Sequence, residues 1–462
     1  MPDIITEPPL QDEPVIEMDL TKGSIIRNLL LLSWPMVLVE ALFMIGQIVD
    51  MIWIGRLGPS AIAGVGLANI CILVLMSMDI GLIMGVRAII SRNTGSGDMR
   101  GVNIIAGQAI ILGASWGILV GVTGILMVKP VFGLFGAEAE VTREGVAYLR
   151  IFFAGWVAIG ILVMGMYSMQ ATGDSKTPMI IELLIRSVHL VICPFLVFGW
   201  SIFPTLGVAG AAAGNVIAHS LGVVIVLFLL FSGRTRIKLT LSDFRPRFDI
   251  FQRILKVGIP ALVMHAQKSF GDMILAWIIV PFGTLAVAAH SLVLRVEMIF
   301  IAIGIGLGGG AGVMAGQNLG ANQPKRAEKS GWQAVGLMEV IMVVSSVAIL
   351  LNAESIIGVF TSEIDLVELG AVFLRIATVG YLGFGLVLVF QDCIASIGDT
   401  VPAMVVSIAI IWVILLPLAY FLPGIINLGV YGVRWAIVTS MIFGALLYLI
   451  YFMMGRWKTK KV

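Results

Sequence analysis

The chain has 462 residues, 59% of them hydrophobic and only 12% charged, whereas soluble globular proteins carry roughly 25% charged and about 45–50% apolar residues. This composition, with a mean hydropathy of +1.05, excludes a water-soluble enzyme and an intrinsically disordered chain. The formal net charge of +2 leaves no basic domain for nucleic acid, so a polytopic membrane protein remains.

Residues 1–24 differ in composition from everything that follows. They hold six acidic residues and one basic residue, Lys22. This is the opposite of a secretory signal, which has a basic start and a small-residue cleavage site. The segment therefore predicts a mobile cytoplasmic leader.

Apolar stretches long enough to cross a bilayer core of about 30 Å follow one another from Ile25 almost to the C-terminus. They predict an all-α polytopic membrane protein with twelve transmembrane helices. The expected spans are 25–54, 60–87, 101–128, 143–170, 178–200, 206–232, 250–279, 285–315, 327–351, 367–394, 402–422 and 429–454.

Basic residues concentrate in the segments that follow even-numbered spans, and acidic residues follow the odd-numbered ones. The basic set is Arg92, Arg100, Lys176, Arg234, Arg236, Lys238, Arg245, Arg247, Arg253, Lys325, Arg326, Lys329, Arg456, Lys458, Lys460 and Lys461. The acidic set is Glu138, Glu140, Glu144, Glu354, Glu363, Asp365 and Glu368. Because cytoplasmic loops carry the excess of Lys and Arg, both termini are predicted to be cytoplasmic.

The two halves of the chain resemble one another at an offset of 225 residues. The offset pairs Pro35 with Pro260, Gly58 with Gly283, Ala61 with Ala286, Gly81 with Gly306, Gly85 with Gly310, Asn93 with Asn318, Gly95 with Gly320, and Gly173-Asp174 with Gly398-Asp399. Each half has an even number of spans, so both halves insert the same way up, related by a pseudo-twofold axis along the membrane normal. The predicted organisation is a leader (1–24), an N-lobe of six helices (25–232), a cytoplasmic linker (233–249), a C-lobe of six helices (250–455) and a basic cytoplasmic tail (456–462).

Four sequence stretches, in this order and topology, resemble the multidrug and toxic compound extrusion (MATE) family. Residues 306–320 read GLGGGAGVMAGQNLG, and their first-half counterpart ends in Ser91-Arg92-Asn93. Residues 171–178 read ATGDSKTP, and residues 396–402 read SIGDTVP. The resemblance covers essentially the whole chain after the leader.

Charged side chains inside a membrane cost about 2.5–3.5 kcal/mol each at mid-helix, so acids within the spans must face protein or water. Seven of the acids within the spans are candidates: Glu40, Asp50, Asp79, Glu182, Asp272, Glu297 and Asp392. Asp392, on the tenth span, is a candidate for the substrate cleft. All four histidines, His189, His219, His265 and His290, also lie within spans.

Helical spacing sorts these residues into faces. Glu40, Phe43, Gln47 and Asp50 share one face of the first span. The offset maps the first three of them onto His265, Lys268 and Asp272 of the seventh span, which predicts two equivalent polar stripes as opposing walls of a cleft. Glu182, Arg186, His189 and Cys193 form another face on the fifth span.

Asp50 is the strongest candidate for an ion-coupling residue. No basic residue lies three or four positions from it, and Gln47 shares its face. A carboxylate in a poorly hydrated cavity can take up a proton or a cation and release it when the cavity opens to water. Pro35 and Pro260 each remove a backbone hydrogen bond, so bends are predicted in the first and seventh spans.

Structural explanations compete with functional ones at several positions. Glu182 and Arg186 are four residues apart in the favourable order and can simply neutralise one another. Lys268 and Asp272 have the same spacing in the weaker order, so pairing and a role in the cleft are both open. His219 and His290 are expected to be satisfied interior histidines, and Glu297 is expected to have a structural partner elsewhere.

The resemblance implies a secondary exporter of bulky, often cationic organic compounds, driven by protons or sodium. In the family's pattern a carboxylate stands at the place of Asp50, which is where a sodium ion would bind. The sequence departs from that pattern at Cys193, where many prokaryotic members have Asp before the proline, and at His189, where Asn is usual. A third departure is Lys268, near which one subgroup has Glu. The identity of the coupling ion therefore stays open. His189 and Glu182 are further candidates for ion-coupling residues, besides Asp50 and Gln47.

Other functions fit the sequence less well. A lipid-linked precursor flippase usually has additional helices and a more basic cavity, and a membrane-embedded enzyme has no evident need of the duplication. A channel would show substrate flux without saturation or counter-ion movement. No metal-ligand cluster, nucleophile motif or phosphate loop is visible, so no enzymatic activity and no cofactor are predicted. The expected partners are small organic cations, H⁺ or Na⁺, and the surrounding lipid of the cytoplasmic membrane, with the protein as a monomer.

Overall fold

The computed structural model describes residues 19–200, 202–425 and 427–460, and within these ranges it is helical without a β-strand. Helical structure is expected, because a helix satisfies its own backbone hydrogen bonds where lipid offers no partners. The helices are α1 (Ile25–Gly55), α2 (Pro59–Ser96), α3 (Met99–Leu134), α4 (Ala139–Ala154), α5 (Trp156–Ala171), α6 (Lys176–Phe198), α7 (Val208–Ser232), α8 (Phe248–Ile279), α9 (Thr284–Gly320), α10 (Pro324–Gly358), α11 (Ile364–Ser396), α12 (Thr400–Ile408), α13 (Leu416–Ile425) and α14 (Val430–Met454).

Among the described residues, ten helices are long and apolar enough to cross a membrane, with Thr400–Ile425 counted as one. The bent pair α4 and α5 raises this number to eleven. α8 is a further helix of 32 residues, and it is more highly charged, with Arg253, Lys256, Lys268 and Asp272 along its length. Large apolar side chains such as Met127 and Val344 are exposed on the outer faces, as expected where helices meet lipid.

Two helices, α4 and α5, divide the expected span over 143–170, and together they are apolar and long enough to form one broken span. α4 and α5 meet at Gly155 with a bend of 49°. The side chain of Val216, from α7, occupies the space that a Cβ at Gly155 would need. A second irregularity joins α12 to α13, where residues Ala409–Leu415 form a π-helical stretch. By contrast, α1 and α8 continue as helices past Pro35 and Pro260.

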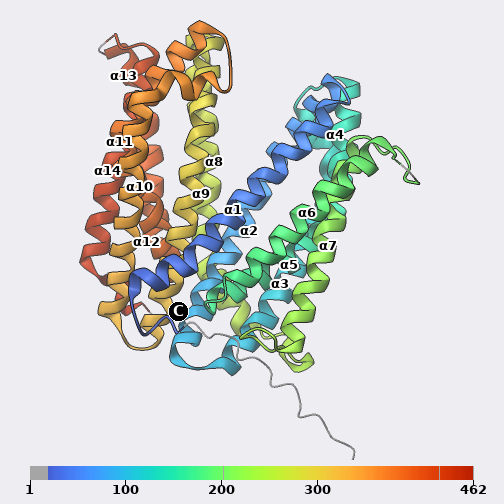
Figure 1. The fold of residues 1–462 in the computed structure, drawn as a ribbon, viewed down its shortest axis with the longest axis vertical. Coiled ribbons are helices and arrows are strands. Elements are labelled where there is room, and N and C mark those ends of the chain that lie inside the picture. The colour runs from blue at the N-terminus through green and yellow to red at the C-terminus, as the bar shows by residue number, and fades with distance from the viewer. Residues whose placement is uncertain (1–18, 201, 426, 461–462) are drawn as a thin grey trace, which may run out of the picture.

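The helices form two groups that spread apart toward one end of the molecule (Figure 1). α3 to α7 make up one group and α8 to α14 the other, with α1 and α2 running between them. α1 packs against α6 and α9, and α2 packs against both α8 and α9. The two groups are therefore joined through the first two helices of each half.

Glycine contacts between the halves come in pairs that repeat with the 225-residue offset. A Cβ on Gly95 would overlap the carbonyl oxygen of Gln317, and a Cβ on Gly320 would overlap that of Arg92. The offset relates Gly95 to Gly320 and Arg92 to Gln317, so the two contacts are reciprocal. Gly81 likewise meets Leu262 of α8, while its counterpart Gly306 meets Val37 of α1. The contacts between the halves therefore repeat along with the residues that make them.

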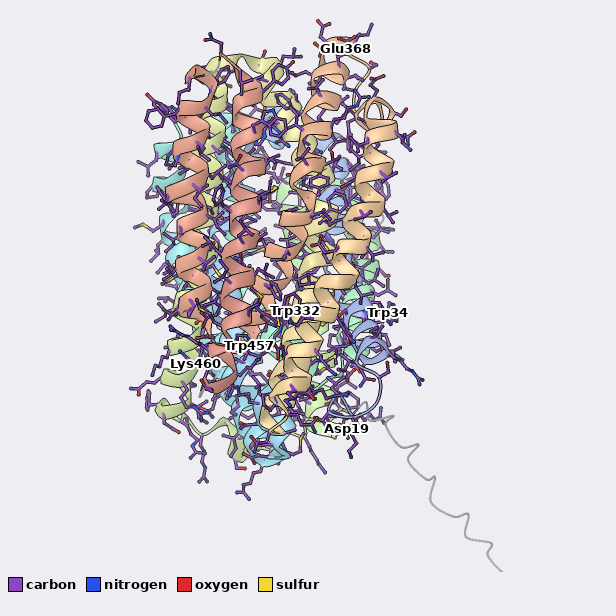
Figure 2. The ribbon with its side chains drawn as sticks, turned by 90° about the vertical axis from the view of Figure 1, so that its left-hand side faces the viewer. Asp19, Trp34, Trp332, Glu368, Trp457 and Lys460 are labelled. Carbon is purple, nitrogen blue, oxygen red and sulfur yellow. The ribbon has the colours of Figure 1, made fainter. Side chains whose placement is uncertain are left out.

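Both described ends of the chain lie at one end of the molecule. Asp19 and Lys460 are found there, and Glu368 lies at the opposite end (Figure 2). The expectation of a mobile leader is wrong for residues 19–24, while residues 1–18 lie outside the described part. Leu20 is fully buried, and Arg326 donates to the carbonyl of Lys22 at 2.7 Å.

The linker and the tail are also packed against the helices. Gln108 of α3 donates to the carbonyls of Asp243 and Arg245 at 2.7 and 2.9 Å. In the described part of the tail, Trp457 is buried and Lys458 pairs with Glu328 at 2.8 Å. The segments outside the spans therefore close one end of the helical bundle.

Candidate functional site

Asp50 of α1 meets two residues of α6 inside the first half of the chain. The distance from Asp50 Oδ1 to His189 Nε2 is 3.0 Å, and the thiol of Cys193 donates to the same oxygen at 3.7 Å. His189 and Cys193 are one helical turn apart, so they point to the same side of α6. All three side chains are buried. The sequence showed no such cluster because its members come from two separate helices.

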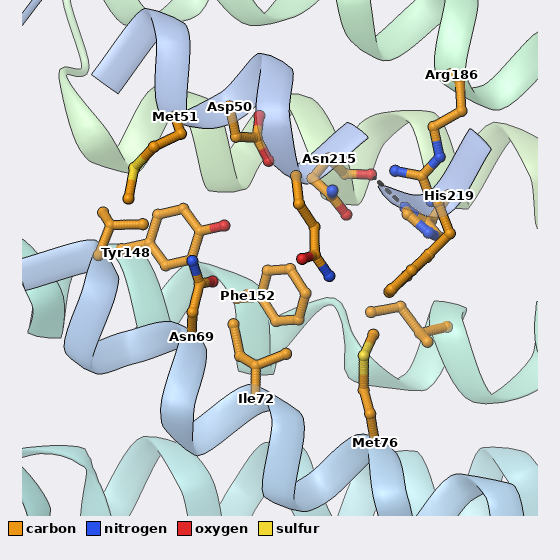
Figure 3. A pocket seen from close by; sticks show the side chains of 14 residues that line it. Asp50, Met51, Asn69, Ile72, Met76, Tyr148, Phe152, Arg186, Asn215 and His219 are labelled. Atoms are coloured by element: carbon orange, nitrogen blue, oxygen red, sulfur yellow. Dashed lines mark hydrogen bonds between the residues drawn. The ribbon is translucent and has the colours of Figure 1, made fainter. Parts of the chain in front are cut away.

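A pocket lies beside this cluster and is bounded by helices of the first half alone. Its lining residues are Phe43, Gln47, Asp50, Met51, Val65, Asn69, Ile72, Met76, Tyr148, Phe152, Ile159, Arg186, Asn215 and His219. Figure 3 shows Asp50, Tyr148 and Asn69 at one side of the pocket and Arg186 with His219 at the other. Amide, phenol, imidazole and carboxylate groups thus share a space walled by apolar and Met side chains.

The predicted face on α1 divides between two places. Phe43, Gln47 and Asp50 line the pocket, but Glu40 lies outside it. Glu40 instead accepts a hydrogen bond from Tyr167 of α5 at 3.3 Å. The guanidinium of Arg87 lies over the Tyr167 ring, 5.0 Å from its centroid.

Arg87 of α2 links the two halves of the chain. It is 1% exposed and donates from Nη1 to Ser396 Oγ of α11 at 3.3 Å. Asp392, one turn earlier on α11, is buried. Within the described residues, Asp392 Oδ2 has no hydrogen-bond partner. Arg87 was missed from the sequence because it stood at the expected end of the second span, whereas α2 continues to Ser96.

The face on α6 is held together by an ion pair. Arg186 Nε donates to Glu182 Oε1 at 2.6 Å, and both side chains are buried, so the pairing indicated by their spacing is correct. The Arg186 guanidinium also lies 5.4 Å from the Phe43 ring centroid. His219 is a satisfied interior histidine, as predicted: its Nδ1 lies 2.8 Å from the carbonyl oxygen of Asn215.

The corresponding residues of α8 do not join the pocket. Lys268 is half-buried and Asp272 is exposed. In the part of the chain that the structure describes, no ion pair joins them. Nε2 of His265 is buried, and no described residue bonds to it. The expected symmetric pair of cleft walls is therefore not matched by the pocket, which Asp50 lines and Lys268 does not.

A buried charged cluster stands in the second half where the pocket stands in the first. Arg434 of α14 lies 3.4 Å from Glu297 Oε1 and 3.1 Å from His290 Nδ1, both on α9. The offset relates His290 to Val65 and Glu297 to Ile72, and both of these line the first-half pocket. The expected partner of Glu297 is therefore Arg434, which the sequence alone did not pair with it.

Sequence comparison agrees with this duplicated organisation. The family model MatE matches residues 35–195 and again residues 260–421. The two matches begin at Pro35 and Pro260, which are the residues that the offset pairs. The chain belongs to the MatE family. It is accordingly a multi-pass membrane transporter and not an enzyme.

Curated MatE relatives cover nearly the whole chain at low identity. A probable multidrug resistance protein NorM of Thermotoga maritima is 25% identical over 94% of this chain and 94% of its own length. The probable multidrug resistance protein YpnP of Bacillus subtilis is 27% identical over 96% and 98%. An FAD transporter of Shewanella oneidensis is 22% identical over 87% and 89%.

Solved structures share the fold of this MatE chain. One, described as the outward-facing conformation of a multidrug resistance MATE family transporter, gives a TM-score of 0.89 at 22% identity and covers 96% of this chain and 98% of its own. Another, of a MOP superfamily transporter from Pyrococcus furiosus, gives 0.89 at 22% identity and covers 97% and 100%. At these identities the likeness concerns the fold alone.

Proposed function

We propose that this MatE protein is a proton-coupled exporter of amphipathic organic compounds, chiefly cations, in the cytoplasmic membrane. The observation that carries the proposal is Asp50, a buried carboxylate beside His189 and at the edge of a polar pocket. Such a group can hold a proton while the pocket is closed and release it when water enters. The multidrug resistance names of several relatives support the substrate class.

The neighbours of Asp50 favour a proton over sodium as the coupling ion. Hard cations prefer oxygen ligands such as carboxylates, carbonyls and water. The atoms next to Asp50 Oδ1 are an imidazole nitrogen and a thiol sulfur, which are poor partners for Na⁺. A carboxylate and an imidazole can instead share and pass a proton.

The architecture supports alternating access between two lobes. With α8 counted, the bent pair and the ten apolar helices give the twelve spans that the sequence predicts. The reciprocal contacts of Gly95 and Gly320 support a pseudo-twofold axis between an N-lobe (25–232) and a C-lobe (250–455). Rocking of the lobes about this crossing would expose a central site to one side and then the other. Basic residues at the closed end favour a cytoplasmic position for both termini, so the spread end faces outward.

Substitution of Asp50 by Asn is the decisive experiment. Asp50→Asn keeps the shape of the side chain but cannot exchange a proton, so we expect a folded protein that has lost gradient-driven export. A gradient of one pH unit is worth about 1.4 kcal/mol, or roughly tenfold accumulation of substrate. The measurement is uptake of a fluorescent organic cation into proteoliposomes under separately imposed proton and sodium gradients.

The matched control is Asp365→Asn, which changes an exposed acid in the first turn of α11. It should export at the wild-type rate. Wild-type export by Asp50→Asn, with unchanged ion dependence, would remove Asp50 from the coupling role. Glu182 and His189 would then be the next candidates. Export driven by a sodium gradient alone would replace the proton by sodium.

Export of an organic anion is a second candidate function, favoured by one residue and one relative. Lys268 is half-buried and unpaired among the described residues, and one relative is named as a transporter of FAD. The same proteoliposomes, loaded with a fluorescent anion, compare the two substrate classes directly. Faster accumulation of the anion, lost in Lys268→Gln, would favour this candidate.

The remaining alternatives have less support. The relatives' names favour an exporter over a lipid-linked precursor flippase. A channel would show flux that neither saturates nor requires a counter-ion. We further propose that the exporter acts as a monomer, surrounded by membrane lipid.

A further inference from the structure

We propose that Asp50, His189 and Cys193 form a binding site for a thiophilic divalent cation of the Zn²⁺ class. The carboxylate, imidazole and thiol donor atoms all lie within 4.8 Å of one another. The inference shares Asp50 with the proposed function, but its test reads metal binding and not transport.

The geometry of the three donor atoms fits tetrahedral coordination. Zinc bonds of about 2.0 Å to N and O and about 2.3 Å to S put N and O about 3.3 Å apart, and S and O about 3.5 Å apart. The observed separations are 3.0 Å between His189 Nε2 and Asp50 Oδ1 and 3.7 Å between Cys193 Sγ and the same oxygen. These two separations therefore lie within a few tenths of an ångström of the tetrahedral values. The third, between the imidazole nitrogen and the sulfur, is no more than 4.8 Å and must close to about 3.5 Å around the ion.

His189 adds an independent observation. Its Nε2 atom is buried and, within the described residues, makes no hydrogen bond of good geometry, although Asp50 Oδ1 lies only 3.0 Å away. The ring nitrogen is therefore not aimed along the line to the carboxylate. A metal ion bound by both side chains would give the nitrogen and the carboxylate oxygen a common partner.

The backbone arrangement suits a metal as well. His189 and Cys193 are four residues apart on one face of α6, the spacing at which paired helical ligands hold zinc in other proteins. Asp50 approaches from α1 and lines the neighbouring pocket. That pocket gives an ion an entry path and gives a water molecule the fourth position, as in sites with three protein ligands.

The charge balance of the site favours a divalent ion. Binding requires the thiolate, so Cys193 releases its proton to water as the metal–sulfur bond forms. One carboxylate, one thiolate and a neutral imidazole then carry two negative charges, which a divalent ion cancels. A neutral site is far less costly to bury than a charged one.

Cobalt titration of the purified full-length protein tests the proposal. Co²⁺ bound to a thiolate in a tetrahedral site gives visible bands together with a near-ultraviolet sulfur-to-cobalt charge-transfer band. We expect both in the wild type, and loss of the charge-transfer band in Cys193→Ser. The double variant Cys71→Ser/Cys393→Ser leaves Cys193 as the only cysteine and should retain the full spectrum, without any change to the site itself.

Absence of the charge-transfer band in the folded wild type, or its loss in the double variant, would overturn the metal site. The double variant keeps the test decisive even if Cys193→Ser does not fold. Loss of export in Asp50→Asn without a cobalt spectrum in the wild type would sink the metal site alone. A cobalt spectrum together with full export by Asp50→Asn would sink the coupling role alone.

Discussion

At the scale of single residues, the ion pair of Glu182 and Arg186 fixes the charge of the pocket wall. The pair is buried, with 2.6 Å between Glu182 Oε1 and Arg186 Nε. Glu182→Gln leaves a buried guanidinium without its counter-charge, which typically costs about 3–5 kcal/mol. We expect a large fall in thermal stability of the purified protein.

An exposed pair provides the matched control for this prediction. Arg375 and Glu354 lie 3.1 Å apart with much of both side chains exposed, and such pairs contribute about 1 kcal/mol or less. Glu354→Gln should therefore change the melting temperature little. A double change, Glu182→Gln with Arg186→Met, should recover much of the loss. Equal effects of Glu182→Gln and Glu354→Gln would contradict the prediction.

Sequence reasoning reaches as far as a single helix at this scale. The spacing of Glu182 and Arg186 predicts their contact because both residues lie on α6. Asp50 and His189 were separate candidates, because no periodicity within a helix relates a residue of α1 to one of α6. The contact of Arg434 with Glu297 was hidden for the same reason.

At the scale of helices, the crossing of α2 and α9 depends on two glycines. A methyl group at Gly95 would overlap the carbonyl oxygen of Gln317, and one at Gly320 would overlap that of Arg92. Gly95→Ala and Gly320→Ala should each lower the free energy of unfolding by about 1–3 kcal/mol, the usual cost of overpacking. Because the contacts are reciprocal, the two losses should be similar.

Gly336 of α10 serves as the control glycine. It is exposed, and a Cβ there would meet no atom within 4 Å. Gly336→Ala should be neutral or stabilise the helix by up to about 1 kcal/mol. Denaturant unfolding in detergent compares the three variants, and a neutral Gly95→Ala would show that the crossing is looser than described.

The elements themselves were largely predictable from apolar runs, while their irregularities were not. The bend at Gly155 lies where Val216 of another helix approaches closely, a contact that the local sequence does not reveal. The π-helical stretch Ala409–Leu415 also carries a tertiary contact, in which Trp412 donates to Gln267 of α8 at 2.9 Å.

At the scale of the whole molecule, the distribution of charge predicts its orientation in the membrane. Ser242 lies in the basic linker, and Glu368 lies at the opposite end of the molecule (Figure 2). Both side chains are exposed. An impermeant thiol reagent applied to intact cells should therefore label Glu368→Cys and spare Ser242→Cys, each in a Cys71→Ser background. The reverse pattern would invert the topology.

The offset of 225 residues was the most informative whole-molecule signal in the sequence. It anticipated which glycines of α2 and α9 have equivalent surroundings, because a duplicated chain repeats its contacts along with its residues. It did not anticipate where the halves differ. The difference between Val65 and His290, for example, is explained only by the contact of Arg434 with His290.

Arg434 has a consequence for the electrical work of transport. In the second half, the offset relates two pocket-lining positions to His290 and Glu297, and there a cation of the chain itself, Arg434, pairs with the carboxylate. If one proton at Asp50 returns for each monovalent cation expelled, no net charge crosses the membrane. A membrane potential without a pH difference should then drive no accumulation in proteoliposomes, and accumulation under voltage alone would require a second moving charge. The pH difference across the membrane would then drive export, and the membrane potential would not.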